Sequence, residues 1–421
     1  MNKKAESPHS IKKLASLAGA AVLGGTALAG FSYFALPPLL SISYSASVLS
    51  ATSSPDASVA LAPKATHLPT PKPLKAIYMS QCVVGTPSFR DSLVKFVEDT
   101  ELNAIVIDIK DFSGGIAFQT DNPILAESVS EDCGARDMKK FLEHLHEKEI
   151  YVIGRITVFQ DPHYTAAHPE QAVQRVSGGV WKDFKGLSFV DVGAKPFWDY
   201  IVELGRESYA LGFDELNFDY VRFPSDGPMS EARYTYGAGK SKAEALEEFF
   251  KYLTENLRPT GAVLSVDLFG MTATNEDDLN IGQVLERALP YFDGVYPMVY
   301  PSHYPKTYNG YADVNAHPYD IVKLAMDTAV AREMATSTKI AGLAFSPIAS
   351  TTPQMYEKPS YHGKVIPWLQ GFDYPVDYTP EMLRAQIEAT KDAGIESYLF
   401  WDAANKYSSL RQVLATPASA Q

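Results

Sequence analysis

The chain has 421 residues, of which 46% are hydrophobic and 21% are charged, so it can bury a large core. Its formal net charge of −13 argues against a nucleic-acid partner, because the phosphate backbone is bound by basic patches. The same charge is compatible with a neutral substrate such as a sugar. The two cysteines, Cys82 and Cys133, permit one disulfide in an oxidising compartment, and free buried thiols are an equal alternative.

The first forty residues differ in character from the rest. Four lysines within residues 1–13 precede an uncharged, apolar run over residues 14–40. The run exceeds the roughly 7–15 residues of a cleaved signal sequence and reaches the roughly 20 that span a bilayer. Lysines on its N-terminal side predict that residues 1–13 are cytoplasmic. We therefore expect a single-pass signal-anchor in the cell membrane, with the bulk of the protein extracytoplasmic. Secretion after cleavage near residues 45–47 is the alternative.

Residues 41–73 are rich in serine, alanine, proline and threonine. Such a composition cannot bury enough apolar surface to fold, so it predicts a linker that leads to a domain over residues 74–414. This domain is long for a single unit, but α/β barrels commonly reach its size.

Strand-like and helix-like patterns alternate along this domain. Eight apolar runs predict strands over residues 75–79, 103–110, 150–157, 215–220, 262–268, 293–300, 364–370 and 396–401. Helical patterns cover residues 88–99, 135–148, 194–211, 242–256, 281–289, 318–334 and 380–393. Eight strands, most of them separated by helices, predict a closed (β/α)8 TIM barrel. A further apolar run at 340–345 makes the count uncertain by one. A doubly wound sheet is disfavoured, because no Gly-rich phosphate fingerprint follows the first strand.

The segment 212–224 contains the sequence Phe-Asp-Tyr-Val-Arg-Phe-Pro and is the most informative part of the chain. In an extended strand, side chains alternate between faces, so Leu216, Phe218 and Tyr220 share one side. Glu215, Asn217 and Asp219 then point to the other side. A strand that is apolar outside and polar inside fits the wall of a parallel barrel, whose strand C-terminal ends carry the chemistry. The alternative is that Asp219 only caps the following turn.

The same alternation, applied to seven of the strands, gathers polar and aromatic side chains at one mouth of the barrel. The residues predicted to point inward there are Asp108, Lys110, Arg155, Thr157, Asn217, Asp219, Ser265, Asp267, Tyr296, Tyr300, Trp368, Gln370, Leu399 and Trp401.

Several segments carry a resemblance to a known family over residues 73–410. They are 104–110, 154–161, 212–224, 265–270, 296–301 and 401–402. With these segments the sequence resembles the glycoside hydrolase-like domain of bacterial envelope proteins, a (β/α)8 barrel distantly similar to the alpha-amylase superfamily. In that superfamily the nucleophile follows the fourth strand and the acid/base follows the fifth. The resemblance places Asp219 in the first role and offers Asp267, where that superfamily has glutamate, for the second.

Glycoside hydrolysis supports this pair on chemical grounds. The reaction needs two carboxyl groups, about 5–5.5 Å apart for retention and about 6.5–9.5 Å apart for inversion. Adjacent barrel strands lie about 4.8 Å apart, which favours the shorter spacing and retention. We assign Asp219 as nucleophile or base and Asp267 as acid. A structural role for Asp267, as acceptor for Arg155 or Tyr300, is an equal alternative.

The other residues near the mouth are candidates for substrate binding. Asp108 and Lys110 either bind sugar hydroxyls or form a buried ion pair, and Arg222 either orients Asp219 or pairs with Asp226. The aromatic rings either stack on sugars or belong to the core. The full substrate-binding set is Asp108, Lys110, Arg155, Asn217, Arg222, Tyr300, His303, Trp368, Gln370 and Trp401. Too few histidines lie at strand ends for a metal-dependent hydrolase, so we expect no metal or cofactor.

The sequence therefore predicts an extracytoplasmic glycoside hydrolase that acts on a polysaccharide or oligosaccharide. The main alternative is a barrel that binds glycan without cleaving it, or that scaffolds envelope proteins. Other hydrolases, including a polysaccharide deacetylase, are a lesser alternative. Neither the sugar nor the oligomeric state follows from the sequence.

Overall fold

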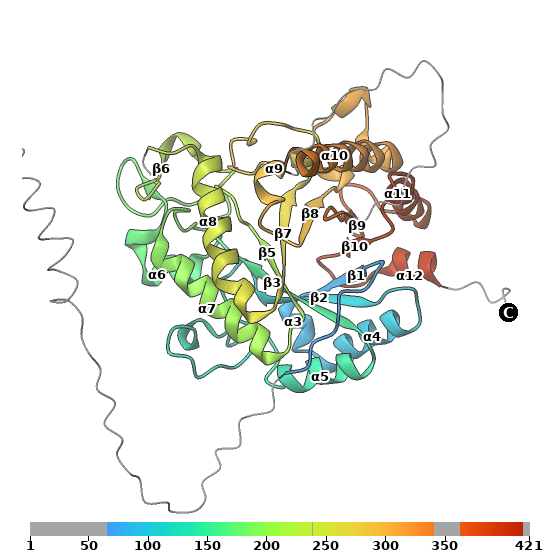
Figure 1. The fold of residues 1–421 in the computed structure, drawn as a ribbon, viewed down its shortest axis with the longest axis horizontal. Coiled ribbons are helices and arrows are strands. Elements are labelled where there is room, and N and C mark those ends of the chain that lie inside the picture. The colour runs from blue at the N-terminus through green and yellow to red at the C-terminus, as the bar shows by residue number, and fades with distance from the viewer. Residues whose placement is uncertain (1–64, 238, 341–362, 416–421) are drawn as a thin grey trace, which may run out of the picture. The chain divides into compact units, whose positions relative to one another are not determined.

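Within the described residues, the chain folds around a closed parallel barrel. The computed structural model describes residues 65–237, 239–340 and 363–415. The barrel strands are β1 (Lys75–Met79), β2 (Ala104–Lys110), β3 (Tyr151–Thr157), β5 (Glu215–Asp219), β7 (Val263–Phe269), β8 (Gly294–Met298), β9 (Trp368–Gln370) and β10 (Tyr398–Trp401). They are hydrogen-bonded in the order β1-β10-β9-β8-β7-β5-β3-β2, with every neighbouring pair parallel (Figure 1). The predicted (β/α)8 barrel is confirmed.

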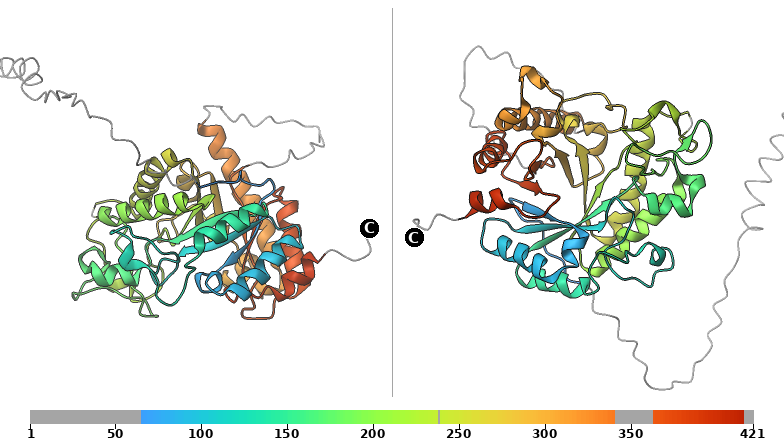
Figure 2. Two further views of the ribbon diagram at one scale, coloured as in Figure 1. Left: turned by 90° about the horizontal axis from the view of Figure 1, so that it is seen from below. Right: turned by 180° about the vertical axis from the view of Figure 1, so that it is seen from behind.

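Helices cover the outside of this barrel, as both further views show (Figure 2). They are α3 (Gln81–Val84), α4 (Pro87–Glu98), α5 (Met138–Glu147), α6 (Pro162–Ala167), α7 (Lys195–Leu211), α8 (Lys242–Leu257), α9 (Leu285–Ala288), α10 (Pro318–Ile340), α11 (Pro380–Asp392) and α12 (Ser408–Leu414). Local signals set several of their ends. Ser241 and Glu244 form a reciprocal capping box that starts α8, and the Thr379 hydroxyl caps α11 before Pro380.

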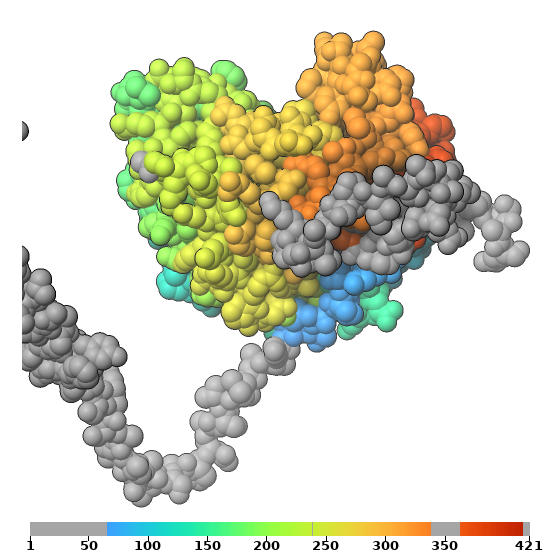
Figure 3. Space-filling model, turned by 45° about the horizontal axis from the view of Figure 1, so that its top comes forward, coloured from blue at the N-terminus to red at the C-terminus, as the bar shows by residue number. Residues whose placement is uncertain are grey.

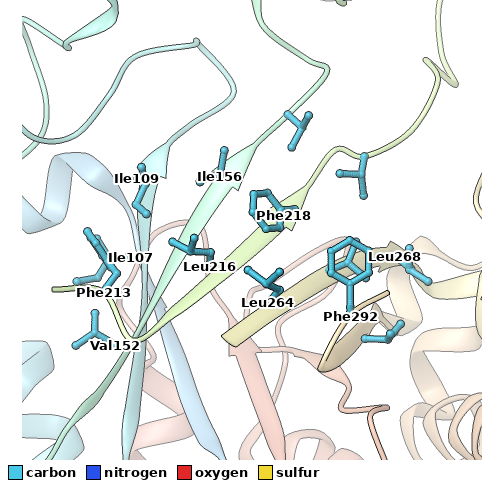
Figure 4. Close-up of a cluster of buried hydrophobic side chains, with 14 of the residues drawn as sticks. Ile107, Ile109, Val152, Ile156, Phe213, Leu216, Phe218, Leu264, Leu268 and Phe292 are labelled. Carbon is cyan, nitrogen blue, oxygen red and sulfur yellow. The ribbon is translucent and has the colours of Figure 1, made fainter. Parts of the chain in front are cut away.

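The period-two alternation of the strands separates two apolar layers. One set of side chains points outward and packs under the helices. Figure 4 shows Ile107, Leu216, Phe218 and Leu264 of this set. The other set fills the barrel interior and includes Ala76, Val106, Ile153, Tyr296 and Leu399. Both faces of each strand are therefore buried, and a one-residue slip in register would exchange the outward set with the interior set.

Three elements are shorter than their sequence patterns predict. β9 covers only Trp368–Gln370, because Pro367 has no N–H to extend the ladder. β8 covers Gly294–Met298, with Pro297 inside it. The helical pattern over 281–289 gives only α9, since Gly282 has a φ of 86° that no α-helix contains.

Several predictions concern residues outside the described ranges. They are the membrane segment over 14–40, most of the linker over 41–73, and most of the apolar run at 340–345. Among the described residues, no helix has the length and apolarity to cross a bilayer. Residues 65–73, whose composition predicts linker, instead pack against the starts of the barrel strands. The Leu68 amide donates to Asp214, and the Leu68 side chain joins the interior core.

A small lobe, which the sequence patterns do not predict, is built from the segments that follow β3 and β5. β4 (Gln174–Arg175) pairs with β6 (Ala232–Arg233) in a two-stranded antiparallel sheet. Its core consists of Val173, Trp181 and Phe189, against which Tyr220 packs. The lobe therefore joins the end of β5 directly.

A disulfide between Cys82 and Cys133 ties α3 to the segment that precedes α5. The bond closes a separation of 51 residues, for which chain entropy predicts about 4 kcal/mol of stabilisation. We expect the double variant Cys82→Ser/Cys133→Ser to lose this amount, measured by urea denaturation without reductant. Wild-type protein unfolded with reductant should match the variant. Equal stability of variant and oxidised wild type would contradict the prediction.

Candidate active site

A pocket opens at the C-terminal ends of the barrel strands. It is lined by Arg155, Asp219, Tyr220, Arg222, Asp267, Phe269, Gly270, Met271, Met298, Tyr300, His303, Tyr304, Trp368 and Trp401. Figure 3 shows the surface hollowed between the yellow-green and orange parts of the chain, which come from the segments after β5 and after β8. This position is where TIM barrels carry their active sites.

Arg155 at the top of β3 holds two carboxylates. Its Nη1 donates to Asp108 Oδ1 at 2.6 Å, and its Nε donates to Asp219 Oδ2 at 3.2 Å. Its Nη2 also donates to Asp219 Oδ2. The Tyr78 hydroxyl completes the network by donating to Asp108. The guanidinium therefore fixes Oδ2 of Asp219. The other carboxylate oxygen, Oδ1, accepts a hydrogen bond from the backbone amide of Tyr220.

Asp267 on β7 is held differently. Its Oδ1 accepts hydrogen bonds from Asn217 Nδ2 at 2.9 Å and Trp368 Nε1 at 2.8 Å. Burial raises the pKa of Asp267 well above its ordinary value, and the nearby negative charge of Asp219 adds to this effect. Because Oδ1 accepts two N–H groups, a proton on this carboxyl resides on Oδ2.

The two carboxyl groups lie close enough to act on one bond. Arg155 Nε is 3.2 Å from Asp219 Oδ2 and 3.8 Å from Asp267 Oδ2. The two oxygens are therefore no farther apart than the sum of these distances, about 7 Å. An oxygen–oxygen distance of at most about 7 Å is compatible with the roughly 5–5.5 Å between the carboxyl groups of retaining glycosidases. It is shorter than most of the roughly 6.5–9.5 Å range of inverting enzymes.

Aromatic rings form one wall of the site. Tyr78 and Trp401 stack with ring centroids 3.8 Å apart, and the Arg155 guanidinium lies 4.8 Å from the Trp401 ring. Trp368 lies edge-on to Trp401 at 5.7 Å, but it is fully buried and serves as a hydrogen-bond donor to Asp267. Partly exposed Trp401 thus offers more ring surface to a ligand than Trp368 does.

Tyr300 and His303 line the pocket from the segment that follows β8. Burial, together with the charges of Asp267 and Asp219, raises the pKa of Tyr300 well above its ordinary value, so its hydroxyl stays protonated. His303 is an exposed residue, and partial desolvation by its surroundings lowers its pKa, which favours a neutral imidazole. The two rings contact each other at 5.3 Å. Both side chains can therefore donate or accept hydrogen bonds without adding charge.

Tyr220 does not lie where strand alternation predicts it. The strand ends at Asp219, and Tyr220 has a φ of 51°, a left-handed conformation that bulky residues rarely adopt. This turn brings Tyr220 to the pocket wall rather than under the helices. Backbone strain of this kind clusters at functional sites.

Lys110 is another departure, because it does not line the pocket. The ladder between β2 and β3 shifts register between Asp108 and Lys110. The ammonium is fully buried, 2.9 Å from Asp161, and lies 5.8 Å from the Phe197 ring of α7. Lys110 therefore forms a buried ion pair rather than a contact to substrate, and its partner is Asp161 instead of Asp108.

Three further predicted residues stand behind the pocket wall rather than in it. Asp108 holds Arg155, and Asn217 holds Asp267. Gln370 accepts the Ser302 amide at 3.2 Å and donates to two carbonyls of the loop after β9. These side chains can position the site but do not line its cavity.

Sequence patterns missed part of the lining. Met271 and Tyr304 belong to it but follow the strand ends, and Met298, which alternation places on the same face as Tyr296 and Tyr300, was not among the residues predicted to point inward. Gly270 carries another detectable signal, since it directly follows β7. A Cβ there would lie 2.2 Å from the Met298 carbonyl oxygen, so only glycine allows this close approach.

Deeper in the barrel, Glu215 forms a separate cluster of polar groups. Its carboxyl accepts hydrogen bonds from Ser265, Tyr296 and Tyr151. Burial raises its pKa to about 7. In the ranges that the structure describes, no group of three or more His, Cys, Asp or Glu side chains is arranged to hold a metal ion.

A family model described as "Putative glycosyl hydrolase domain" matches residues 76–407. This range includes every barrel strand except the first residue of β1. No curated protein matches the chain.

Two solved structures share this fold, and a third is similar in sequence. The PgaB (BpsB) glycoside hydrolase domain from Bordetella bronchiseptica is 14% identical, with 82% of this chain and 99% of that one aligned at a TM-score of 0.54. Alpha-L-fucosidase isoenzyme 2 from Paenibacillus thiaminolyticus is 12% identical, covering 81% of this chain and 48% of that one at a TM-score of 0.51. A hypothetical protein from Ruminiclostridium thermocellum ATCC 27405 is 33% identical, covering 49% of this chain and 98% of that one at a TM-score of 0.42.

Proposed function

The chain belongs to the putative glycosyl hydrolase domain family, and we propose that it cleaves a polysaccharide or oligosaccharide with Asp219 and Asp267 as its catalytic pair. One observation carries this proposal. Two carboxyl groups line one pocket within about 7 Å of each other, a spacing compatible with glycoside hydrolysis, yet their surroundings differ in charge. Both are buried, but Asp219 accepts hydrogen bonds from the Arg155 guanidinium, whereas Asp267 lies 3.8 Å from its Nε and has a raised pKa. Carboxyl groups whose environments differ in this way suit the roles of nucleophile and acid.

The reaction follows from this arrangement. Asp267 donates the Oδ2 proton to the glycosidic oxygen as the bond to the anomeric carbon breaks. Asp219 attacks that carbon through Oδ1, since Arg155 holds Oδ2, and a glycosyl-enzyme ester forms. The ionised Asp267 then takes a proton from water, which attacks the same carbon and releases Asp219. Trp401 stacks on the sugar, and Tyr300 and His303 bond its hydroxyls.

The location of the protein is part of the same proposal. We place the barrel outside the cytoplasm, attached to the membrane through residues 14–40. The disulfide between Cys82 and Cys133 supports this location, because such bonds persist in oxidising compartments. The lysines before the apolar run support the orientation.

Product stereochemistry tests the mechanism. Oligosaccharides of defined linkage, both plant and cell-wall derived, are incubated with the full chain, and the first sugar released is observed by proton NMR before it mutarotates. Retention of the anomeric configuration is the expected result, because the pair permits direct attack by Asp219. An inverted product would instead make Asp219 a base. The absence of hydrolysis across the set would contradict the proposal.

A further inference from the structure

Arg222 is the second arginine of the pocket, and it is held by neutral groups. Its Nη1 donates to the Phe223 carbonyl and to the Ser225 hydroxyl, each at 3.1 Å. Its guanidinium carbon lies 5.0 Å from the centre of the Tyr220 ring and 6.0 Å from that of Phe189. Aromatic faces hold a guanidinium in a fixed plane without neutralising its charge.

This positive charge has no partner within the described part of the chain. No carboxylate among the described residues comes within 4.0 Å of Arg222, including Asp219 and Asp226, the two partners that the sequence suggests. Arg155 in the same pocket differs, since it meets Asp108, Asp219 and Asp267. Nε and Nη2 of Arg222 also make no hydrogen bond with the described residues. Two adjacent donors of a planar cation therefore remain available at the pocket wall.

We propose that Arg222 binds a carboxylate on the substrate, so that the enzyme acts on a glycan with acidic sugar residues. A guanidinium fork matches a planar carboxylate through two parallel hydrogen bonds. This inference rests on the proposed hydrolysis of glycans and names the substrate class of the same pocket. It departs from the neutral sugar with which the net charge of −13 is compatible.

The lobe next to Arg222 carries several exposed basic residues. Phe189 and Tyr220, on which the guanidinium rests, both belong to the core contacts of this lobe. Within residues 172–190 the exposed charges are all positive: Arg175, Lys182 and Lys185. The one carboxylate there, Asp183, is buried and accepts the amides of Lys185 and Leu187. The segment after β5, which completes the lobe, adds exposed Arg233 and Asp226 and half-buried Glu231, so Arg222 itself carries the inference.

Matched substrates test the proposal. Oligosaccharides of polygalacturonate, alginate and hyaluronan are compared with the same oligosaccharides after reduction of their carboxyl groups to alcohols. We expect the full chain to show a kcat/KM at least about tenfold higher for an acidic form than for its reduced counterpart. Arg222→Gln should abolish this ratio chiefly through KM, and Arg222→Lys should restore part of it. Arg384→Gln, which removes an exposed charge on α11, should leave the ratio unchanged.

Binding to the Asp219→Asn variant, measured by calorimetry, separates this inference from the proposed reaction. Suppose that an acidic oligosaccharide binds, that Arg222→Gln weakens this binding, and that the wild type hydrolyses none of the substrates. This result would support the role of Arg222 and refute the proposed hydrolysis. Hydrolysis of reduced or neutral glycans alone would keep the reaction and overturn the inference. The inference would also be overturned if no acidic oligosaccharide bound. The same holds if Arg222→Gln lowered kcat/KM equally for the acidic and the carboxyl-reduced oligosaccharides.

Discussion

Asp219→Asn is expected to lower kcat by about 10³-fold or more while oligosaccharide binding persists. The amide has the size of the carboxylate, and its oxygen can still accept hydrogen bonds from Arg155, with only the bond from the Tyr220 amide lost to the NH2 group. It cannot attack the anomeric carbon as an anion. Steady-state kinetics give kcat, and calorimetry gives the affinity for an oligosaccharide. The retained binding distinguishes a lost chemical step from a lost site.

The matched control is Asp161→Asn, which alters another buried carboxylate outside the pocket. Asp161 lies 2.9 Å from the buried ammonium of Lys110, so its neutralisation leaves that charge unpaired. We expect this variant to lose about 3 kcal/mol of unfolding free energy and to keep the kcat of its folded fraction. Unchanged turnover in Asp219→Asn would refute the assignment of Asp219. Binding without any turnover in the wild type would favour the non-catalytic glycan-binding alternative.

The fold was predictable because each barrel strand is buried on both sides. Runs such as 104–110 are therefore apolar on both faces, and helices separate most of them. What the sequence patterns missed depends on contacts between distant segments. Residues 65–73 resemble a linker in composition, yet Leu68 reaches the barrel interior. β4 and β6 are two residues long each and lie far apart in the chain, so no local period reveals them.

The site was predictable only as far as strand alternation holds. Asp219 and Asp267 follow it, so the sequence brings them to one pocket. Lys110 lies beyond a register shift in β2, and Tyr220 lies beyond the end of β5 in a left-handed conformation. Alternation cannot anticipate either event. The unpaired charge of Arg222 is likewise a property of three-dimensional packing, since Asp226 is nearby in sequence but forms no ion pair with it.

The pH dependence of catalysis is expected to report Asp267. The acid must carry its proton, so kcat/KM of the wild type falls as the pH rises through the raised pKa of Asp267. Asp267→Asn should lower kcat/KM by about 10²–10⁴-fold on ordinary glycosides and remove this alkaline limb. Dinitrophenyl glycosides leave without protonation, so the variant should cleave them with a much smaller loss. Persistence of the limb in Asp267→Asn would assign the acid to another group.

The free energy of unfolding should also depend on the protonation of Asp267. The folded-state pKa of Asp267 exceeds the unfolded value of about 3.9, so its contribution is fully present below that value and is lost as the pH rises through the folded pKa. Urea denaturation should therefore show a smaller decline with pH in Asp267→Asn than in the wild type. Asp219 raises the pKa of Asp267 through its charge, so Asp219→Asn should move the carboxyl titration of Asp267, followed by carbon-13 NMR, to lower pH. Asp161→Asn should leave that titration in place. A titration that does not move in Asp219→Asn would mean that the two carboxyl groups do not act as one pair.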